Sequence, residues 1–196
     1  MDSIEFYNKN AAKYFLETVN LDMSQFLDGF IELLPEGASV LDLGCGSGRD
    51  SARFIDEGFD VTSLDGSREM CNLASIHIGQ DVLCLTFDEM DFEEVFDGIW
   101  ASASLLHVPS KDIEKILAKV VKSLKPNGFL YMSFPYGNFE GLRHGRYYKE
   151  YRTRELKNLV NRLEQLEIIE LKKSNDLRTD RKTIWISAIV QKREGK

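Results

Sequence analysis

The stretch that decides the fold reads Val40-Leu-Asp-Leu-Gly-Cys-Gly-Ser-Gly-Arg-Asp50. A short apolar run ends in a turn with three glycines, and a helical pattern follows at once. Glycine has no Cβ, so this turn can adopt positive φ angles and let a ligand lie against the backbone. The following helix presents free N–H groups and the positive end of its dipole. The segment therefore predicts a ligand site, either for a dinucleotide pyrophosphate or for the amino-acid half of S-adenosylmethionine.

The spacing of the glycines distinguishes these two ligands. A dinucleotide fingerprint is G-x-G-x-x-G, but Arg49 stands where its third glycine belongs. The pattern here is G-x-G-x-G, formed by Gly44, Gly46 and Gly48. Asp42, inside the strand, suits a ligand that carries an ammonium group and suits a pyrophosphate poorly. The spacing therefore favours S-adenosylmethionine.

The next strand ends at Asp65, 21 residues after Gly44. A carboxylate at this strand end can accept hydrogen bonds from both hydroxyls of a ribose, in NAD and in S-adenosylmethionine alike. The alternative is a simple capping loop, Asp65-Gly66-Ser67, before the next helix. The adenine ring is expected after the third strand, and the candidates beside it are Phe87, Asp88, Glu89, Met90 and, from the preceding helix, Met70.

Hydrophobic periodicity predicts alternating helices and strands outward from this segment. The helical patterns cover residues 2–18, 22–34, 49–57, 67–76, 111–124 and 153–163. The strand patterns cover 39–43, 59–64, 81–86, 96–101, 129–134, 168–173 and 184–190. Such alternation predicts an α/β fold with a parallel sheet and helices on both faces. The two adjacent strands at the end indicate an antiparallel strand at one edge of a mixed sheet.

Composition narrows the class of protein. The 196 residues suit one domain, and 43% hydrophobic with 29% charged residues is typical of a globular chain. No apolar run could span a bilayer, and no basic segment followed by an apolar one marks the N-terminus. The three cysteines, Cys45, Cys71 and Cys84, have no metal-like spacing. We therefore expect a cytoplasmic protein with reduced cysteines, no metal site and no membrane partner.

The charge is unevenly distributed along the chain. The net charge is −7, but residues 143–182 carry 12 Lys/Arg and 7 Asp/Glu, a balance of +5, and the remainder carries −12. An acidic chain is repelled by phosphate backbones, so nucleic acid is not an expected partner. The basic segment either faces a small anion or is an ordinary solvated surface.

Three segments, residues 40–49, 65–67 and 96–109, resemble the class I S-adenosylmethionine-dependent methyltransferases. More narrowly they resemble the small bacterial single-domain enzymes of the tellurite-resistance and ubiquinone-biosynthesis type, and the resemblance extends over about 7–190. It implies a Rossmann-like, doubly wound, seven-stranded mixed sheet whose last strand is inserted antiparallel.

The resemblance also implies an organisation for the chain. Residues 1–196 would form a single methyltransferase domain. The N-terminal helices within 1–35 would cover the cofactor or substrate, and residues 135–152 would form an acceptor-side loop.

The same resemblance implies roles for individual residues. Tyr7 and Tyr14 would close over the cofactor, and Arg49 would approach its carboxylate or form a salt bridge to a neighbouring helix. Many relatives have Asp where this chain has Phe87, so Asp88 or Glu89 would take over the adenine contact. The expected cofactor-binding set is Tyr7, Tyr14, Asp42, Gly44, Cys45, Gly46, Gly48, Arg49, Asp65, Gly66, Ser67, Met70, Phe87, Asp88, Glu89, Ala101 and Ser102.

The implied reaction is transfer of a methyl group from S-adenosylmethionine to a small molecule, which leaves S-adenosylhomocysteine. For such an in-line displacement the protein mainly supplies orientation and desolvation. His107 is the candidate general base, and the alternative is a capping or packing residue at the turn before Pro109. The expected acceptor-binding residues are His107, Tyr136, Arg143, Arg146, Tyr147 and Arg178, with His144 beside them, and they suit an anionic or aromatic molecule.

Other functions are also considered. Neither the Asn/Asp-Pro-Pro-aromatic motif nor a Pro-Cys pair is present, which argues against methylation of DNA bases. An NAD-dependent oxidoreductase is disfavoured by the glycine spacing and by Asp42. A non-catalytic module that only binds S-adenosylmethionine remains open, because cofactor-binding residues do not prove turnover.

Overall fold

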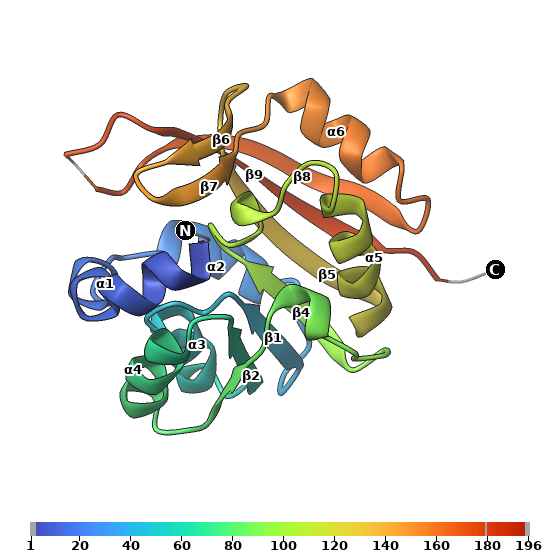
Figure 1. The fold of residues 1–196 in the computed structure, drawn as a ribbon. Helices are drawn as coiled ribbons and strands as arrows, with labels where there is room; N and C mark the ends of the chain where they lie inside the picture. The colour runs from blue at the N-terminus through green and yellow to red at the C-terminus, as the bar shows by residue number, and fades with distance from the viewer. Residues whose placement is uncertain (1–2, 179, 195–196) are drawn as a thin grey trace.

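A seven-stranded mixed sheet forms the centre of the fold, in the order β3-β2-β1-β4-β5-β9-β8 (Figure 1). The computed structural model describes residues 3–178 and 180–194. The strands are β1 (Ser39–Leu43), β2 (Asp60–Asp65), β3 (Val82–Cys84), β4 (Phe96–Ala101), β5 (Leu124–Pro135), β8 (Leu166–Asn175) and β9 (Ile184–Lys192). Strands β1 to β5 pair in parallel.

The last strand, β9, runs antiparallel to both of its neighbours, β5 and β8. The expected seven-stranded sheet with an inserted antiparallel strand is confirmed. The expectation that the antiparallel strand lies at the edge is wrong, because β9 pairs along both sides and leaves β8 at the edge.

Helices cover both faces of this sheet, as expected. They are α1 (Ser3–Thr18), α2 (Ser24–Ile31), α3 (Arg49–Asp56), α4 (Arg68–Ile78), α5 (Ile113–Ser123) and α6 (Thr153–Asn161), with short 3₁₀ turns η1 (Phe87–Glu89) and η2 (Leu105–His107). Successive strand residues point to opposite faces. Leu41 and Ile99 accordingly pack with α5 and α6, whereas Val40 and Trp100 pack with Phe30 of α2 and with α3.

Several predicted boundaries change in the structure. The predicted helix start at Asp2 lies outside the described residues. Helix α2 ends at Ile31 rather than Leu34, and β3 is three residues long because the chain turns into η1 soon afterwards. These differences occur at element ends, where local patterns carry the least information.

The segment expected to be an acceptor-side loop contains a β-hairpin instead. Strands β6 (Glu140–Arg143) and β7 (Arg146–Lys149) pair antiparallel around His144 and Gly145. Both turn residues have positive φ, 51° and 79°, as a two-residue type I′ turn requires. Histidine is an uncommon residue in that position, which is why the pattern was not predicted.

Helix α1 is held against this hairpin at the carboxyl ends of the strands. The backbone N–H of Tyr147 donates to Ser3 Oγ at 3.1 Å, and α1 also packs along α4. Figure 1 shows α1 between α4 and the hairpin. Among the described residues, no helix is long and apolar enough to cross a membrane.

Candidate functional site

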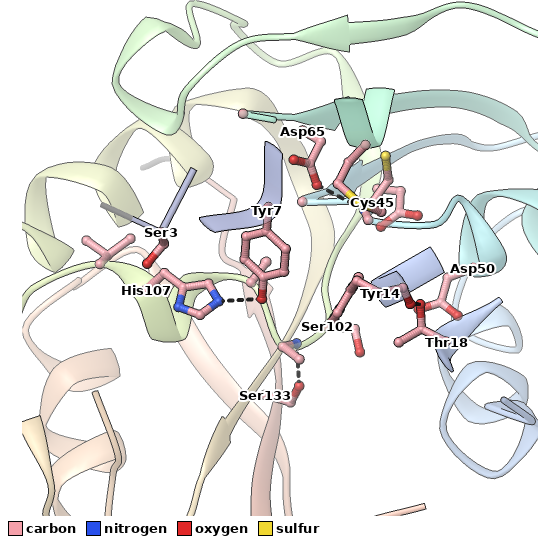
Figure 2. A pocket seen from close by; sticks show the side chains of 18 of the residues that line it. Ser3, Tyr7, Tyr14, Thr18, Cys45, Asp50, Asp65, Ser102, His107 and Ser133 are labelled. Atoms are coloured by element: carbon pink, nitrogen blue, oxygen red, sulfur yellow. Dashed lines mark hydrogen bonds between the residues drawn. The ribbon is translucent and has the colours of Figure 1, made fainter. Parts of the chain in front are cut away.

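A cavity of about 980 Å³ lies at the carboxyl ends of the central strands, and α1 closes part of it (Figure 2). Ligand pockets usually measure about 300–1,000 Å³, so this one has room for a cofactor and a small acceptor together. The sequence-predicted residues that line it are Tyr7, Tyr14, Asp42, Gly44, Cys45, Gly46, Arg49, Asp65, Gly66, Ser67, Met70, Phe87, Asp88, Ser102, His107, Tyr147 and Arg178.

The glycine turn is attached to the end of β2. The N–H groups of Gly44 and Cys45 both donate to the Leu64 carbonyl, at 2.8 and 2.9 Å. Gly44 has a φ of 79°, and a Cβ there would lie 2.5 Å from Ser104 Cβ. Only glycine therefore fits at this position, for steric as well as conformational reasons.

Asp65 lies beside this turn with both carboxylate oxygens engaged. Oδ2 accepts the Gly46 N–H at 3.0 Å, and Oδ1 accepts the Ser67 N–H at 2.8 Å. Burial raises the pKa of Asp65, and these backbone hydrogen bonds oppose that rise. Each oxygen keeps a further lone pair with which it could accept from a ligand hydroxyl.

Asp42 is a second buried carboxyl group at the cavity wall. Its Oδ2 accepts from Ser51 Oγ at 2.7 Å, and Ser51 Oγ in turn accepts from Ser63 Oγ at 2.7 Å. Burial, and then the nearby charge of Asp50, raise the pKa of Asp42. A cationic group in the cavity would stabilise the ionised form of Asp42.

The cavity wall also contains a buried hydroxyl that lacks a partner. Ser104 Oγ makes no hydrogen bond within the described part of the chain, although it is buried. Buried polar groups are almost always hydrogen-bonded, so this atom indicates a polar ligand. Phe87 and buried Met70 supply apolar walls nearby. These surroundings fit a molecule with an amino-acid part, a ribose and a flat ring.

Arg49 lines the cavity, and its approach to a cofactor carboxylate stays a prediction. Its guanidinium binds Asp50 through two contacts, at 2.6 and 2.8 Å, and its Nη1 donates to the Thr18 carbonyl at 3.4 Å. Asp50 also accepts the indole N–H of Trp100 at 2.8 Å. The expected salt bridge to a neighbouring helix is therefore wrong, because the carboxylate comes from the adjacent residue.

Three predicted cofactor residues do not line the cavity. Gly48 is the N-cap residue before α3, and a Cβ there would lie 2.9 Å from Ile78 Cγ2, so packing against α4 explains this glycine. Glu89 turns back to accept from Thr86 and caps η1. Ala101 is buried in the core on the α5 side of the sheet.

Asp88 lines the cavity, but its carboxylate is engaged outside it. It forms an ion pair with Lys115 at 2.6 Å, with both side chains mostly exposed. Neither acidic candidate for the adenine contact therefore directs a free carboxylate into the cavity.

His107 is held between two groups at the rim of the cavity. Its Nδ1 lies 2.6 Å from the Tyr147 carbonyl, which can only accept, so we assign the ring proton to Nδ1. Nε2 then accepts from the Tyr7 hydroxyl at 2.9 Å, as Figure 2 shows. Burial, with a smaller contribution from the charge of Arg146, lowers the pKa of His107 to about 4. The imidazole is therefore neutral at pH 7.

The predicted acceptor residues divide into two groups. His107, Tyr147 and Arg178 line the cavity. The others point elsewhere: Tyr136 packs against Lys173, Arg143 forms an ion pair with Glu150, and Arg146 stacks on Phe6.

Sequence reasoning missed a polar wall at the ends of β5, β8 and β9. Ser133 pairs with Ser187 across β5 and β9, and Tyr131 lies on the same side. Asp176 accepts from the indole N–H of Trp185 at 3.1 Å and from Arg178 at 3.4 Å. No motif marks these residues, because they meet only through the insertion of β9.

Comparison with known proteins agrees with this site. A family model described as a methyltransferase domain matches residues 40–128. YqeM of Bacillus subtilis, named as a methyltransferase, is 36% identical over 104 residues, which is 50% of this chain and 42% of that protein. A ubiquinone biosynthesis O-methyltransferase of Rickettsia typhi is 24% identical over 139 residues, which is 67% of this chain and 56% of that protein. The chain thus spans about half the length of these curated relatives.

A solved structure shows the same fold along nearly the whole chain. It is the 1,6-didemethyltoxoflavin-N1-methyltransferase of Burkholderia thailandensis, with 1,6-didemethyltoxoflavin and S-adenosylhomocysteine bound. It has a TM-score of 0.79 and 22% identity, and the match covers 97% of this chain and 87% of that one. The ubiquinone-biosynthesis resemblance is supported by the relatives, whereas the tellurite-resistance resemblance stays a prediction. The family model begins at the strand before the glycine turn, and the relatives that share this region are named as methyltransferases, so both findings agree with the resemblance to the class I S-adenosylmethionine-dependent methyltransferases.

Proposed function

We propose that this chain binds S-adenosylmethionine at the glycine turn and promotes transfer of its methyl group to a small-molecule acceptor. The observation that carries the proposal is the single cavity, which joins Gly44 and Asp65 at one end to Ser187 and Trp185 at the other. A cofactor held at the first end would leave the second end for the acceptor.

The residues of the first end suit the parts of the cofactor. Asp65 would accept from the ribose hydroxyls, and Asp42 would face the cationic amino-acid part. Ser104 Oγ would gain the hydrogen bond that it lacks. Phe87 and Met70 would enclose the adenine ring. When bound, the cofactor supplies the methyl group, whose bond to sulfur breaks as the acceptor lone pair bonds to carbon.

The second end determines what we propose for the acceptor. Its wall combines the hydroxyls of Ser133 and Ser187 with the side chain of Arg178. These groups suit a small anionic or aromatic molecule and offer no extended basic groove for nucleic acid. We further propose a cytoplasmic location, which the three free cysteines support.

His107 has a geometry that favours positioning over general base catalysis. Its Nε2 already accepts from the Tyr7 hydroxyl, and a pKa of about 4 makes the ring a weak base at neutral pH. We propose that His107 orients Tyr7, which lies over the cavity from α1. A base role would require the acceptor proton to pass through the Tyr7 hydroxyl.

Calorimetric titration with S-adenosylhomocysteine, beside NADH, tests the cofactor. We expect micromolar binding of S-adenosylhomocysteine alone. Asp65→Ala should weaken it by roughly a hundredfold, because two hydrogen bonds to a charged group are lost. Asp60→Ala, at the exposed start of the same strand, is the matched control. Binding of NADH, or no binding of either compound, would overturn the proposal.

Turnover needs a separate measurement. Wild-type protein is incubated with methyl-labelled S-adenosylmethionine and a mixture of metabolites, and labelled products are counted. Labelled product supports a transferase. Tight binding of S-adenosylhomocysteine without any labelled product would instead favour the non-catalytic binding module.

A further inference from the structure

A second, smaller cavity of about 170 Å³ lies on the outer side of α1. It is formed where α1, strand β7 and the connection between β8 and β9 meet. Figure 1 shows the hairpin and that connection above α1. Tyr14 lines both cavities, so the smaller one adjoins the proposed methyl-transfer site.

Cationic side chains predominate in the wall of the small cavity. Lys13, Arg146 and Arg181 come from three separate elements, and Glu17 is the one carboxylate among the described lining residues. Glu17 lies 3.8 Å from Lys13, with both side chains substantially exposed. Three positive groups against one negative group leave a local excess of positive charge.

Arg146 differs from the other two cations in having a buried donor without a partner among the described residues. Its Nη1 donates to the Tyr7 hydroxyl at 3.2 Å, and its guanidinium stacks on Phe6, 4.6 Å from the ring centre. Its Nε is buried without a hydrogen-bond partner in the described part of the chain. No described carboxylate lies within ion-pair distance of Arg146 or Arg181. A buried N–H of a charged group without a partner is costly and indicates an absent acceptor.

Arg178, which lines the large cavity and pairs with Asp176 at 3.4 Å, contributes to the same electrostatic surroundings. The charges of Arg146, Arg181 and Arg178 all act on the Tyr148 hydroxyl, where they oppose the rise in its pKa caused by burial. The guanidinium of Arg146 lies 5.2 Å from the Tyr148 ring centre. The charges of three arginines therefore reach Tyr148, although Tyr148 is not among the described residues that line either cavity. The structure thus brings together part of the basic segment 143–182.

We infer that the small cavity binds a phosphate or carboxylate group, through Arg146, Arg181 and Lys13. Guanidinium groups bind such oxyanions through paired N–H donors, and the free Nε of Arg146 supplies one of them. The anion is either a free ion or a group carried by the acceptor. The second source rests on the proposed function.

The first arm of the test uses inorganic phosphate. It is titrated by calorimetry at constant ionic strength, with the protein saturated with S-adenosylhomocysteine so that the cofactor end of the large cavity is filled. The double variant Lys13→Gln/Arg181→Gln removes two charges from the small cavity. Arg154→Gln/Lys157→Gln removes the same two charges from the exposed face of α6 and is the matched control. Each of these side chains is exposed, so both variants should fold.

We expect the first double variant to raise the phosphate Kd by about tenfold or more, the effect of losing a charge-assisted hydrogen bond, and the control to leave it unchanged. Equal effects in both variants, or no phosphate binding to the wild type, would overturn the inference. Failure of S-adenosylhomocysteine to bind, with phosphate binding intact, would refute the proposed function alone.

The second arm identifies the source of the anion. Labelled product from the metabolite mixture is passed over an anion exchanger. If the exchanger retains the product, and if Lys13→Gln/Arg181→Gln raises the acceptor KM and leaves kcat unchanged, the anion belongs to the acceptor. An unretained product, together with the phosphate binding of the first arm, assigns the cavity to a free anion.

Discussion

Replacing Gly48 by alanine should destabilise the fold without weakening cofactor binding. Gly48 has a φ of 75°, a left-handed conformation that costs about 1–2 kcal/mol for a residue with a Cβ. The added Cβ would also lie 2.9 Å from Ile78 Cγ2 and 3.2 Å from Ala74 Cβ, and overpacking of this kind costs about 1–3 kcal/mol. Together these terms predict a loss of about 2–5 kcal/mol in the free energy of unfolding.

A second substitution separates the two terms. In an Ile78→Ala background the closest contact disappears and the 3.2 Å approach to Ala74 Cβ remains, so the cost of Gly48→Ala should fall towards the conformational term of about 1–2 kcal/mol. Urea denaturation of the wild type, both single variants and the double variant measures this coupling. Calorimetry with S-adenosylhomocysteine, below the unfolding transition, should give nearly the same Kd for all four proteins.

Two results would refute this reasoning. If the two substitutions are additive in the free energy of unfolding, the contact between α3 and α4 does not explain the glycine. If Gly48→Ala leaves stability intact and weakens binding of S-adenosylhomocysteine strongly, Gly48 belongs to the cofactor site, as the sequence pattern implied.

Three further variants test the buried polar groups, each by urea denaturation. Trp100→Phe removes a donor from buried Asp50 and should cost about 1–3 kcal/mol; an unchanged stability would show that this hydrogen bond contributes nothing. The folded-state pKa of His107, about 4, lies below its unfolded value of about 6.5, so the unfolded state binds more protons between these pH values. The free energy of unfolding of the wild type should therefore fall by up to about 3 kcal/mol as pH falls through that window, and that of His107→Asn should fall less. Equal slopes of this free energy against pH in the two proteins would contradict the burial of a neutral ring. Burial raises the pKa of Asp42, so its contribution to stability is present at low pH and is lost as pH rises through the raised pKa. The free energy of unfolding of Asp42→Asn should therefore rise relative to that of the wild type between pH 5 and pH 8, while the variant binds S-adenosylhomocysteine more weakly. A difference in this free energy that stays constant with pH would contradict the raised pKa.

The cofactor half of the site could be predicted because its residues follow one another closely along the chain. The turn from Gly44 to Gly46 and the strand end at Asp65 belong to consecutive elements, and parallel pairing of β1 with β2 places their carboxyl ends side by side. Gly48 shows the limit of this reasoning. Its φ is positive like those of the other two glycines, but it contacts α4 instead of the cavity.

The acceptor half could be predicted only in part. Tyr147 and Arg178 line the cavity as expected, whereas Arg143 and Arg146 point away from it. The hairpin turn at His144 determines which of these residues reach the cavity, because it sets which side chains of β6 and β7 face α1.

By itself, the amino-acid sequence determined the α/β class, the glycine turn and the carboxylate at the end of β2, since each depends on short-range periodicity and spacing. Only the tertiary structure decided the wall opposite them. Strand β9 pairs with β5 and brings Ser187 beside Ser133, and the turn after β8 carries Asp176 to the same opening. These contacts depend on which strand edges pair across long stretches of chain. That choice depends on burial over the whole sheet, and local sequence patterns do not encode it.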